Sequence, residues 1–425
     1  MLIAIAVLFV LVYAAIALEH PIGVNKSASA LLGAGLLWTI YATATGDHTL
    51  VGRQLDESVA ATAQIVFFLI GAMTIVEVID AHDGFEVITS RIGTTSQVRL
   101  MWLIGFVAFF LSAILDNLTT TIVMVSLVQR LIARRDDRLL FASLIVIAAN
   151  AGGAWTVIGD VTTTMLWIGG QITPLNIMGA VFLPSLVNLL VPLAFISFLV
   201  KGKTIAPPPR ADGLQTIRSL ERNLMFCLGL GSLIAVPAFK AATHLPPFMG
   251  VLLGLGIVWL VGEIIHRDKD EHVRRPLTLA HALTRIDMSS IVFFVGILLA
   301  VACLEHAGLL TILARWLEAT IGRQDVIVVV LGLLSAVIDN VPLVAATMGM
   351  YDLGHYPPDN FLWEFIAYCA GTGGSILIIG SAAGVAAMGL ERIEFLWYAR
   401  RIAVPALAGY LAGAVVYVAQ HAALH

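Results

Sequence analysis

Long apolar segments recur along the whole chain and restrict the folds that it can adopt. An α-helix needs about 20 consecutive apolar residues to cross the hydrocarbon core of a bilayer. Hydrophobic residues make up 59% of the chain and charged residues only 12%, whereas soluble domains contain about 25% charged residues. The sequence therefore predicts an integral membrane protein, and several segments are so long, or so interrupted by Gly and Pro, that about ten to twelve crossings with broken or re-entrant pieces are expected. The apolar segments lie near 2–18, 27–45, 59–79, 99–133, 139–170, 177–200, 222–243, 247–265, 287–304, 326–351, 362–390 and 396–423.

Four pairs of short sequences, repeated in the same order, indicate an internal duplication. SAILDN ends at Asp116-Asn117, and SAVIDN ends at Asp339-Asn340. The sequence predicts an all-α polytopic membrane protein with two inverted repeats, each with a re-entrant or hairpin-like Asp-Asn segment and a broken transmembrane helix. The other pairs are QIVFF at 64–68 with SIVFF at 290–294, HDG at 82–84 with HAG at 306–308, and GGAWTVIG at 152–159 with GGSILIIG at 373–380.

The duplication and the polar connections divide the chain into five expected parts. Lysine and arginine gather in the linker between the halves and after the first Asp-Asn segment, which places both in the cytoplasm under the positive-inside rule. The equivalent loop of the second half, 351–360, has neither residue type and is expected on the opposite side, as inverted topology requires. The parts are N-terminal transmembrane helices at 1–58, a first repeat at 59–200, a cytoplasmic linker at 201–221, transmembrane helices with a polar loop at 222–286, and a second repeat at 287–425.

The first Asp-Asn segment carries side chains that suit a small cation such as Na+. Asp116, Asn117, Thr119 and Thr120 offer carboxylate, amide and hydroxyl oxygens inside an apolar run, where a charged residue is rare and marks an ion pathway. A break in the helix would let these oxygens and freed backbone carbonyls converge on one ion. Helix capping by the Asp or Asn side chain is the structural alternative.

A glycine-rich segment supplies a second set of polar side chains. Three glycines between 152 and 159 permit an unwound stretch. Asn150 precedes them, and Asp160, Thr162 and Thr163 follow at the start of the next expected helix, where backbone N–H groups are unpaired. Capping is again the alternative. A phosphate-binding loop is disfavoured, because the segment lacks the Lys and the spacing of G-x-x-x-x-G-K-[ST].

The two copies are unequal, which favours a site nearer the first half. Ser381 stands in the second copy where the first has Asp160, and Gly371 stands where the first has Asn150. We therefore expect Na+ to bind at Asp116 and Asp160. Four side chains of the second half are expected to complete or neighbour this site: Ser335, Asp339, Asn340 and Ser375.

His82 and His306 occupy matched positions in the two copies. Because histidine titrates near neutral pH, both are candidates for pH sensing. Capping of an interfacial helix is the simpler interpretation of both residues.

Enzymatic and nucleic-acid functions find no support in the sequence. The motifs H-E-x-x-H and G-x-S-x-G are absent, and no cofactor is expected. The net charge of −4 is small and leaves no basic face for nucleic acid. An intramembrane aspartyl protease would also use two aspartates, but not within matched Asp-Asn motifs of a duplicated chain.

Three stretches carry a family resemblance: ILDNLTTTIVMVSLVQRL, AANAGGAWTVIGDVTTTMLWIGGQITP and SAVIDNVPLVAA. Together they resemble the NhaD-type Na+/H+ antiporters of the ion transporter superfamily, over nearly the whole chain. Asp116-Asn117 and Asp339-Asn340 resemble the Ser-Asn-Thr tips of re-entrant hairpins in the sodium-coupled dicarboxylate symporters of that superfamily. The resemblance implies an inverted-repeat fold with scaffold and transport regions, an elevator-like movement and a homodimer. We expect a multi-pass protein of the inner (plasma) membrane, in contact with its lipid.

The sequence thus favours exchange of Na+, and also Li+, for H+ by alternating access. The metal cation and the proton would compete for the buried carboxylates of Asp116 and Asp160, with Asp339 as a third candidate. A sodium- or proton-coupled carrier of a dicarboxylate or oxyanion on the same fold is the first alternative, although a fixed carboxylate would repel an anion. A passive cation channel, whose flux would not depend on an opposing proton gradient, is the second.

Overall fold

The computed structural model describes residues 1–89, 96–199, 218–337 and 339–424, and every helix or strand assigned in these ranges is a helix. The expected linker lies outside the described residues except for 218–221. Of the described helices, seven are long and apolar enough to cross a membrane, which confirms an all-α polytopic membrane protein. These are α3 (Lys26–Thr45), α4 (His48–Ala81), α10 (Pro174–Leu199), α11 (Ser219–Thr243), α12 (Pro247–His266), α15 (Met288–His306) and α22 (Ala403–Leu424).

Helix α12 buries one side and leaves an apolar side exposed. In α12 the side chains of Val251 and Val258 are buried, whereas Leu253 and Leu260 are 55% and 63% exposed. A bilayer accepts such a surface, because lipid tails are as apolar as leucine and the helix satisfies its own backbone hydrogen bonds. The exposed leucines are therefore expected to face lipid.

Shorter helices hold the repeated motifs. Each Asp-Asn segment joins two of them, and each glycine-rich segment joins two more. α9 and α20 have only 8 and 10 residues, so they are too short to cross the bilayer, since a helix rises about 1.5 Å per residue. The first set is α6 (Gln97–Ser112), α7 (Asn117–Leu131), α8 (Arg135–Gly153) and α9 (Val161–Ile168); the second is α17 (Gln324–Leu334), α18 (Asn340–Met350), α19 (Phe361–Gly373) and α20 (Ala382–Glu391).

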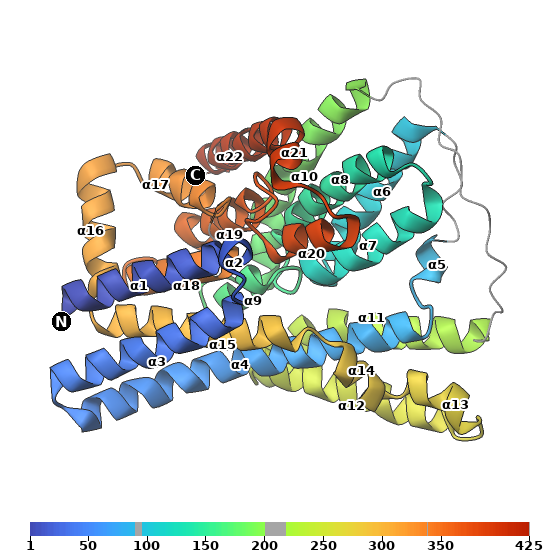
Figure 1. Cartoon of the computed structure of the whole chain (residues 1–425), viewed down its shortest axis with the longest axis horizontal. Helices are drawn as coiled ribbons and strands as arrows, with labels where there is room; N and C mark the ends of the chain where they lie inside the picture. Colours follow the sequence, from blue (N-terminus) through green and yellow to red (C-terminus); the bar gives the residue numbers. More distant parts are fainter. Residues whose placement is uncertain (90–95, 200–217, 338, 425) are drawn as a thin grey trace.

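The two sets of short helices pack against each other in a crossed manner. Within the sets, α6 contacts α8 and α17 contacts α19. Between the sets, α7 contacts α20 and α18 contacts α9, so the helix after each Asp-Asn segment lies against the short helix of the other half. Figure 1 shows this group above a layer of long helices in which α3, α4, α11, α12 and α15 lie side by side.

The remaining helices connect these groups or flank them. The apolar segment near 2–18 forms α1, Leu2–Ala17, which is shorter than the seven candidate spans. α16 links α15 to α17 at one end of the molecule (Figure 1). The others are α2 (Glu19–Ile22), α5 (Glu86–Thr89), α13 (Glu271–Arg274), η1 (Arg275–Leu277), α14 (Leu279–Arg285), α16 (Leu309–Ile321) and α21 (Phe395–Arg401).

Two glycines allow close approach of the helices that carry the motifs. A Cβ atom on Gly152 would lie 2.1 Å from the carbonyl oxygen of Phe109, and one on Gly373 would lie 2.0 Å from that of Gly332. Both distances are far below van der Waals contact, so only glycine fits at these positions. The pairs α6–α8 and α17–α19 thus pack backbone to backbone at corresponding places.

The approach at Gly152 predicts a large stability effect for a small substitution. Gly152→Ala should lower the free energy of unfolding by about 1–3 kcal/mol, because the added methyl group forces α6 and α8 apart. Gly35→Ala in α3 is the control, since no atom lies within 4 Å of its added Cβ. Thermal unfolding in detergent should show a lower midpoint for Gly152→Ala only. Equal midpoints for the two variants would contradict the packing described.

Candidate ion-binding site

Four helices begin close to one another, and a side chain caps each of them. Backbone N–H groups of a first helical turn have no partner within the helix, and a side-chain oxygen at the cap position satisfies one of them. Capping, which the sequence left open as an alternative for Asp116 and Asp160, is therefore observed at both, and Asp339 is a cap as well. The caps are Asp116 on α7, Asp160 on α9, Asp339 on α18 and Ser381 on α20.

Asp160 lies at the centre of a buried hydrogen-bond network, with only 1% of the residue exposed. Its Oδ1 accepts hydrogen bonds from the backbone N–H and the hydroxyl of Thr162, both at 2.8 Å. Its Oδ2 accepts one from the amide Nδ2 of Asn117 at 2.5 Å, and the amide of Asn340 lies 3.4 Å away. Each of these contacts places a donor group on the carboxylate of Asp160.

Asn150 extends this network into the second half of the chain. Its Oδ1 accepts a hydrogen bond from Asn117 at 2.9 Å. Its Nδ2 donates to the hydroxyl oxygens of Ser375 and Ser381, each at 2.9 Å. Asn150 is fully buried, and both polar atoms of its amide have partners. Residues from α7, α8 and the start of α20 are thereby held in one arrangement.

Asp116 and Asp160 border the same small cavity of about 20 Å³. Asp116 Oδ2 accepts a hydrogen bond from the Thr119 hydroxyl at 2.6 Å, and the rest of the cavity wall is mostly apolar, including Met73 and Val76 of α4. A cavity needs about 10–15 Å³ to hold one water molecule, so this space suits a single small ligand. The apolar wall strengthens any charge interaction inside by excluding bulk water.

The structure does not bring every predicted site residue into this network. Asp339 instead forms an ion pair with Lys26, with Nζ and Oδ2 3.5 Å apart. The Ser335 hydroxyl donates to the carbonyl oxygen of Ala370, and that of Thr163 donates to the carbonyl oxygen of Asp160. The hydroxyl of Thr120 is buried and has no hydrogen-bond partner among the residues that the structure describes.

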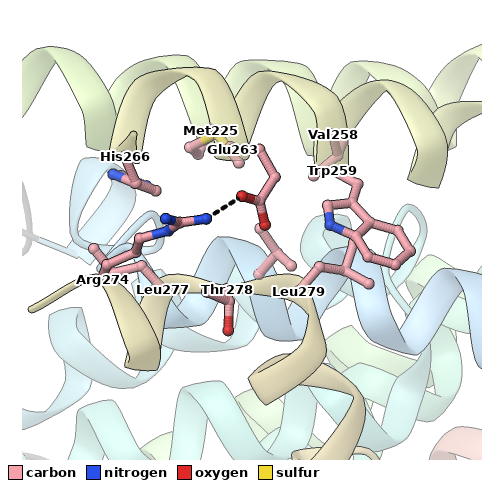
Figure 2. A pocket seen from close by; sticks show the side chains of 11 residues that line it. Met225, Val258, Trp259, Glu263, His266, Arg274, Leu277, Thr278 and Leu279 are labelled. Carbon is pink, nitrogen blue, oxygen red and sulfur yellow. Dashed lines mark hydrogen bonds and ion pairs between the residues drawn. The ribbon is translucent and has the colours of Figure 1, made fainter. Parts of the chain in front are cut away.

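The two histidines lie apart from this network. His82 is the C-cap residue of α4 and is buried: its Nδ1 contacts the carbonyl oxygen of Val78, and its Nε2 contacts Nε2 of His266 at 2.7 Å. Figure 2 shows His266 beside the ion pair of Arg274 and Glu263, whose atoms are 2.6 Å apart. His306 contacts the hydroxyl of Ser58 at 3.1 Å. Neither histidine contacts Asp116 or Asp160, and a pH-sensing role for them stays a prediction.

Sequence reasoning missed two residues that the structure connects to these aspartates. Ser381 contacts Asn150, and its position opposite Asp160 in the duplication was the signal that could have included it. Lys26 contacts Asp339, and a lysine at the edge of an apolar run was the only sign of it.

Comparisons with known proteins show that the chain is similar to transport proteins. The profile of the citrate transporter family (CitMHS) matches residues 7–365. Sodium/proton antiporter 1 of Arabidopsis thaliana is 51% identical over 99% of this chain and 72% of its own length, and sodium/proton antiporter 2 of the same plant is 49% identical over 98% and 99%. The Na(+)/H(+) antiporter NhaD of Vibrio cholerae is 30% identical over 97% of this chain and 91% of its own length.

The position of Asn150 predicts a measurable loss of stability on truncation. Asn150→Ala should lower the free energy of unfolding by about 1–3 kcal/mol, because Asn117 and two serines lose their buried partner. Asn176→Ala, at an exposed position of α10, should change it by less than about 0.5 kcal/mol. Thermal unfolding of both purified variants checks the difference, and similar midpoints would show that the network contributes little.

Proposed function

Because the chain belongs to the citrate transporter family, and within it to the NhaD-type Na+/H+ antiporters, we propose that it exchanges Na+ for H+ across a membrane. The relatives named sodium/proton antiporters support this exchange, and the shared cavity of Asp116 and Asp160 supports its chemistry. That cavity is the observation on which the proposal rests. Li+, which has the same charge and smaller size, is proposed as a second substrate.

The carboxylates of Asp116 and Asp160 would bind either the cation or protons. A hard cation such as Na+ prefers oxygen ligands. The two carboxylates border the cavity, and the amide groups of Asn117 and Asn340 and the hydroxyl of Thr162 contact Asp160 beside it. Asn117 now directs its amide nitrogen at Asp160 and Asn150. With Na+ bound, we propose that the side-chain amide of Asn117 flips, so that its oxygen takes the place of its nitrogen and becomes a ligand of Na+. Protonation of the carboxylates would release the cation.

We propose that alternating access comes from two inverted repeats, 59–200 and 287–425. Matched contacts support the repeats: Ser112 donates to Ala149 and Ser335 donates to Ala370, at corresponding places in the two halves. The crossed packing of α7 on α20 and of α18 on α9 also supports them. In this proposal the Asp-Asn segments are the re-entrant tips, and 154–160 and 374–381 are the breaks in transmembrane helices.

We further propose that the protein is a homodimer of the inner (plasma) membrane.

An exchange that moved one net charge would be driven by about 2.3 kcal/mol for every 100 mV of membrane potential. The ratio of protons to cations therefore decides whether the membrane potential contributes to transport.

The name of the matched family favours one alternative, a carrier of citrate or a similar anion. The helix N-termini near the network would attract an anion. The carboxylates of Asp116 and Asp160 oppose it, since they carry the same charge as the substrate. A transport assay in vesicles distinguishes the citrate carrier from the Na+/H+ exchanger. Citrate uptake coupled to an ion gradient would support the carrier, whereas Na+-driven proton movement without citrate would support the exchanger.

Removal of either carboxylate should strongly slow exchange. In proteoliposomes, Asp116→Asn and Asp160→Asn should each lower the rate of Na+-driven proton movement by more than about tenfold, which corresponds to about 1.4 kcal/mol. Asp136→Asn, at an exposed position in the first turn of α8, is the matched control and should transport normally. An Asp116→Asn variant that exchanges at the normal rate and pH dependence would remove Asp116 from the proposed site.

Competition between Na+ and H+ predicts how the affinity for Na+ depends on pH. Ligands must lose their protons before a cation binds, so the apparent KM for Na+ should rise as pH falls, by up to about tenfold per pH unit for each proton displaced. The maximal rate should change less than KM. Initial rates between pH 7 and 9.5 with Na+, Li+ and K+ test this, and a KM that does not change with pH would exclude shared carboxylates.

A further inference from the structure

Lys26 places a positive charge on the aspartate of the second Asp-Asn segment. Its ammonium lies 3.5 Å from Oδ2 of Asp339 and 4.5 Å from the centre of the Phe293 ring. Lys26 begins α3, Asp339 caps α18, and Phe293 belongs to α15. The side chains of Lys26 and Asp339 are only 19% and 12% exposed, so solvent screens the pair less than a surface ion pair.

The surroundings of this pair contain few other charges. Lys26 and Asp339 line a cavity of about 310 Å³ together with Tyr13 of α1 and Glu19 of α2. The Glu19 carboxylate accepts a hydrogen bond from the backbone N–H of Lys26 at 3.1 Å. α20 contributes the apolar Val385 and Met388, and α15 contributes the Phe293 ring. Among the described residues that line this cavity, Lys26 is therefore the one that balances Asp339.

The ion pair is connected to the proposed cation site through the next residue of the chain. Asn340 follows Asp339 directly, and its amide lies 3.4 Å from Asp160 Oδ2. Charges interact over several ångströms in a medium of low dielectric constant. An uncompensated charge on Asp339 would thus attract both Na+ and protons toward Asp160, and an uncompensated charge on Lys26 would repel them.

We propose that Lys26 is a built-in counter-ion that keeps Asp339 from binding the transported cation and so determines the ion affinity of the Asp116–Asp160 site. Lys26 is a positioning residue in this scheme, because it contacts neither Asp116 nor Asp160. The inference rests on the proposed Na+/H+ exchange. It explains why the two copies of the Asp-Asn motif do not act alike: one faces a small cavity beside a second carboxylate, and the other faces an ammonium group.

The proposal predicts opposite effects for the two partners. In proteoliposomes, Lys26→Gln should lower the KM for Na+ at alkaline pH by about threefold to tenfold and shift the pH profile toward alkaline values, since Asp339 then adds its charge. Asp339→Asn should raise the KM by a similar factor and shift the profile the other way, since Lys26 stays unbalanced. The double variant should lie near the wild type. Lys26→Arg keeps the charge and should resemble the wild type.

The outcomes separate this inference from the function on which it rests. A wild-type protein without Na+/H+ exchange would contradict the proposed function itself. If the wild type exchanges but both single variants change KM in the same direction, or neither changes it, the counter-ion role is wrong and the pair is only structural. Size-exclusion profiles identify variants that do not fold, and Asp339→Asn alone still tests the predicted sign if Lys26→Gln is one of them.

Discussion

The central part of the structure depends on keeping the carboxylate of Asp160 inside an apolar bundle. An unpaired charge in such surroundings is strongly unfavourable, so its oxygens need several donors. Thr162 supplies two of them from its own helix, and Asn117 supplies a third from the other side of the site. The starts of α7 and α9 therefore have to lie together for this one charge to be tolerated.

The interrupted helices make this arrangement possible and create a second requirement. Each interruption leaves backbone N–H groups without partners inside the bundle, where water cannot replace them. Caps satisfy these groups, and three of the four caps are aspartates. The fourth is the neutral Ser381, and the charge of Asp339 is balanced by Lys26, so the uncompensated carboxylates are concentrated at Asp116 and Asp160.

Residues close in sequence were the easier part of the site to predict. Asp116 with Thr119 and Asp160 with Thr162 interact within three residues, so their capping role and their proximity follow from local helix geometry. Contacts between the halves were harder. Asn150 contacts Ser375, which lies 225 residues further along the chain, and only the duplication suggested that these two segments would be neighbours. The partner of Asp339 was missed, because nothing in the duplication refers to residues before the first repeat.

The sequence by itself determined that this chain is a helical membrane protein with charged residues at two matched places. Long apolar runs and a repeated motif can be recognised in a sequence without knowing the fold. It also indicated that the first half carries more ligands, since Asp160 has no acidic counterpart in the second half. Only the tertiary structure showed that Asp116 and Asp160 line one cavity and that Asp339 is paired with Lys26. These contacts depend on helix packing between segments far apart in the chain. Local sequence contains no information about the spatial distance between such segments.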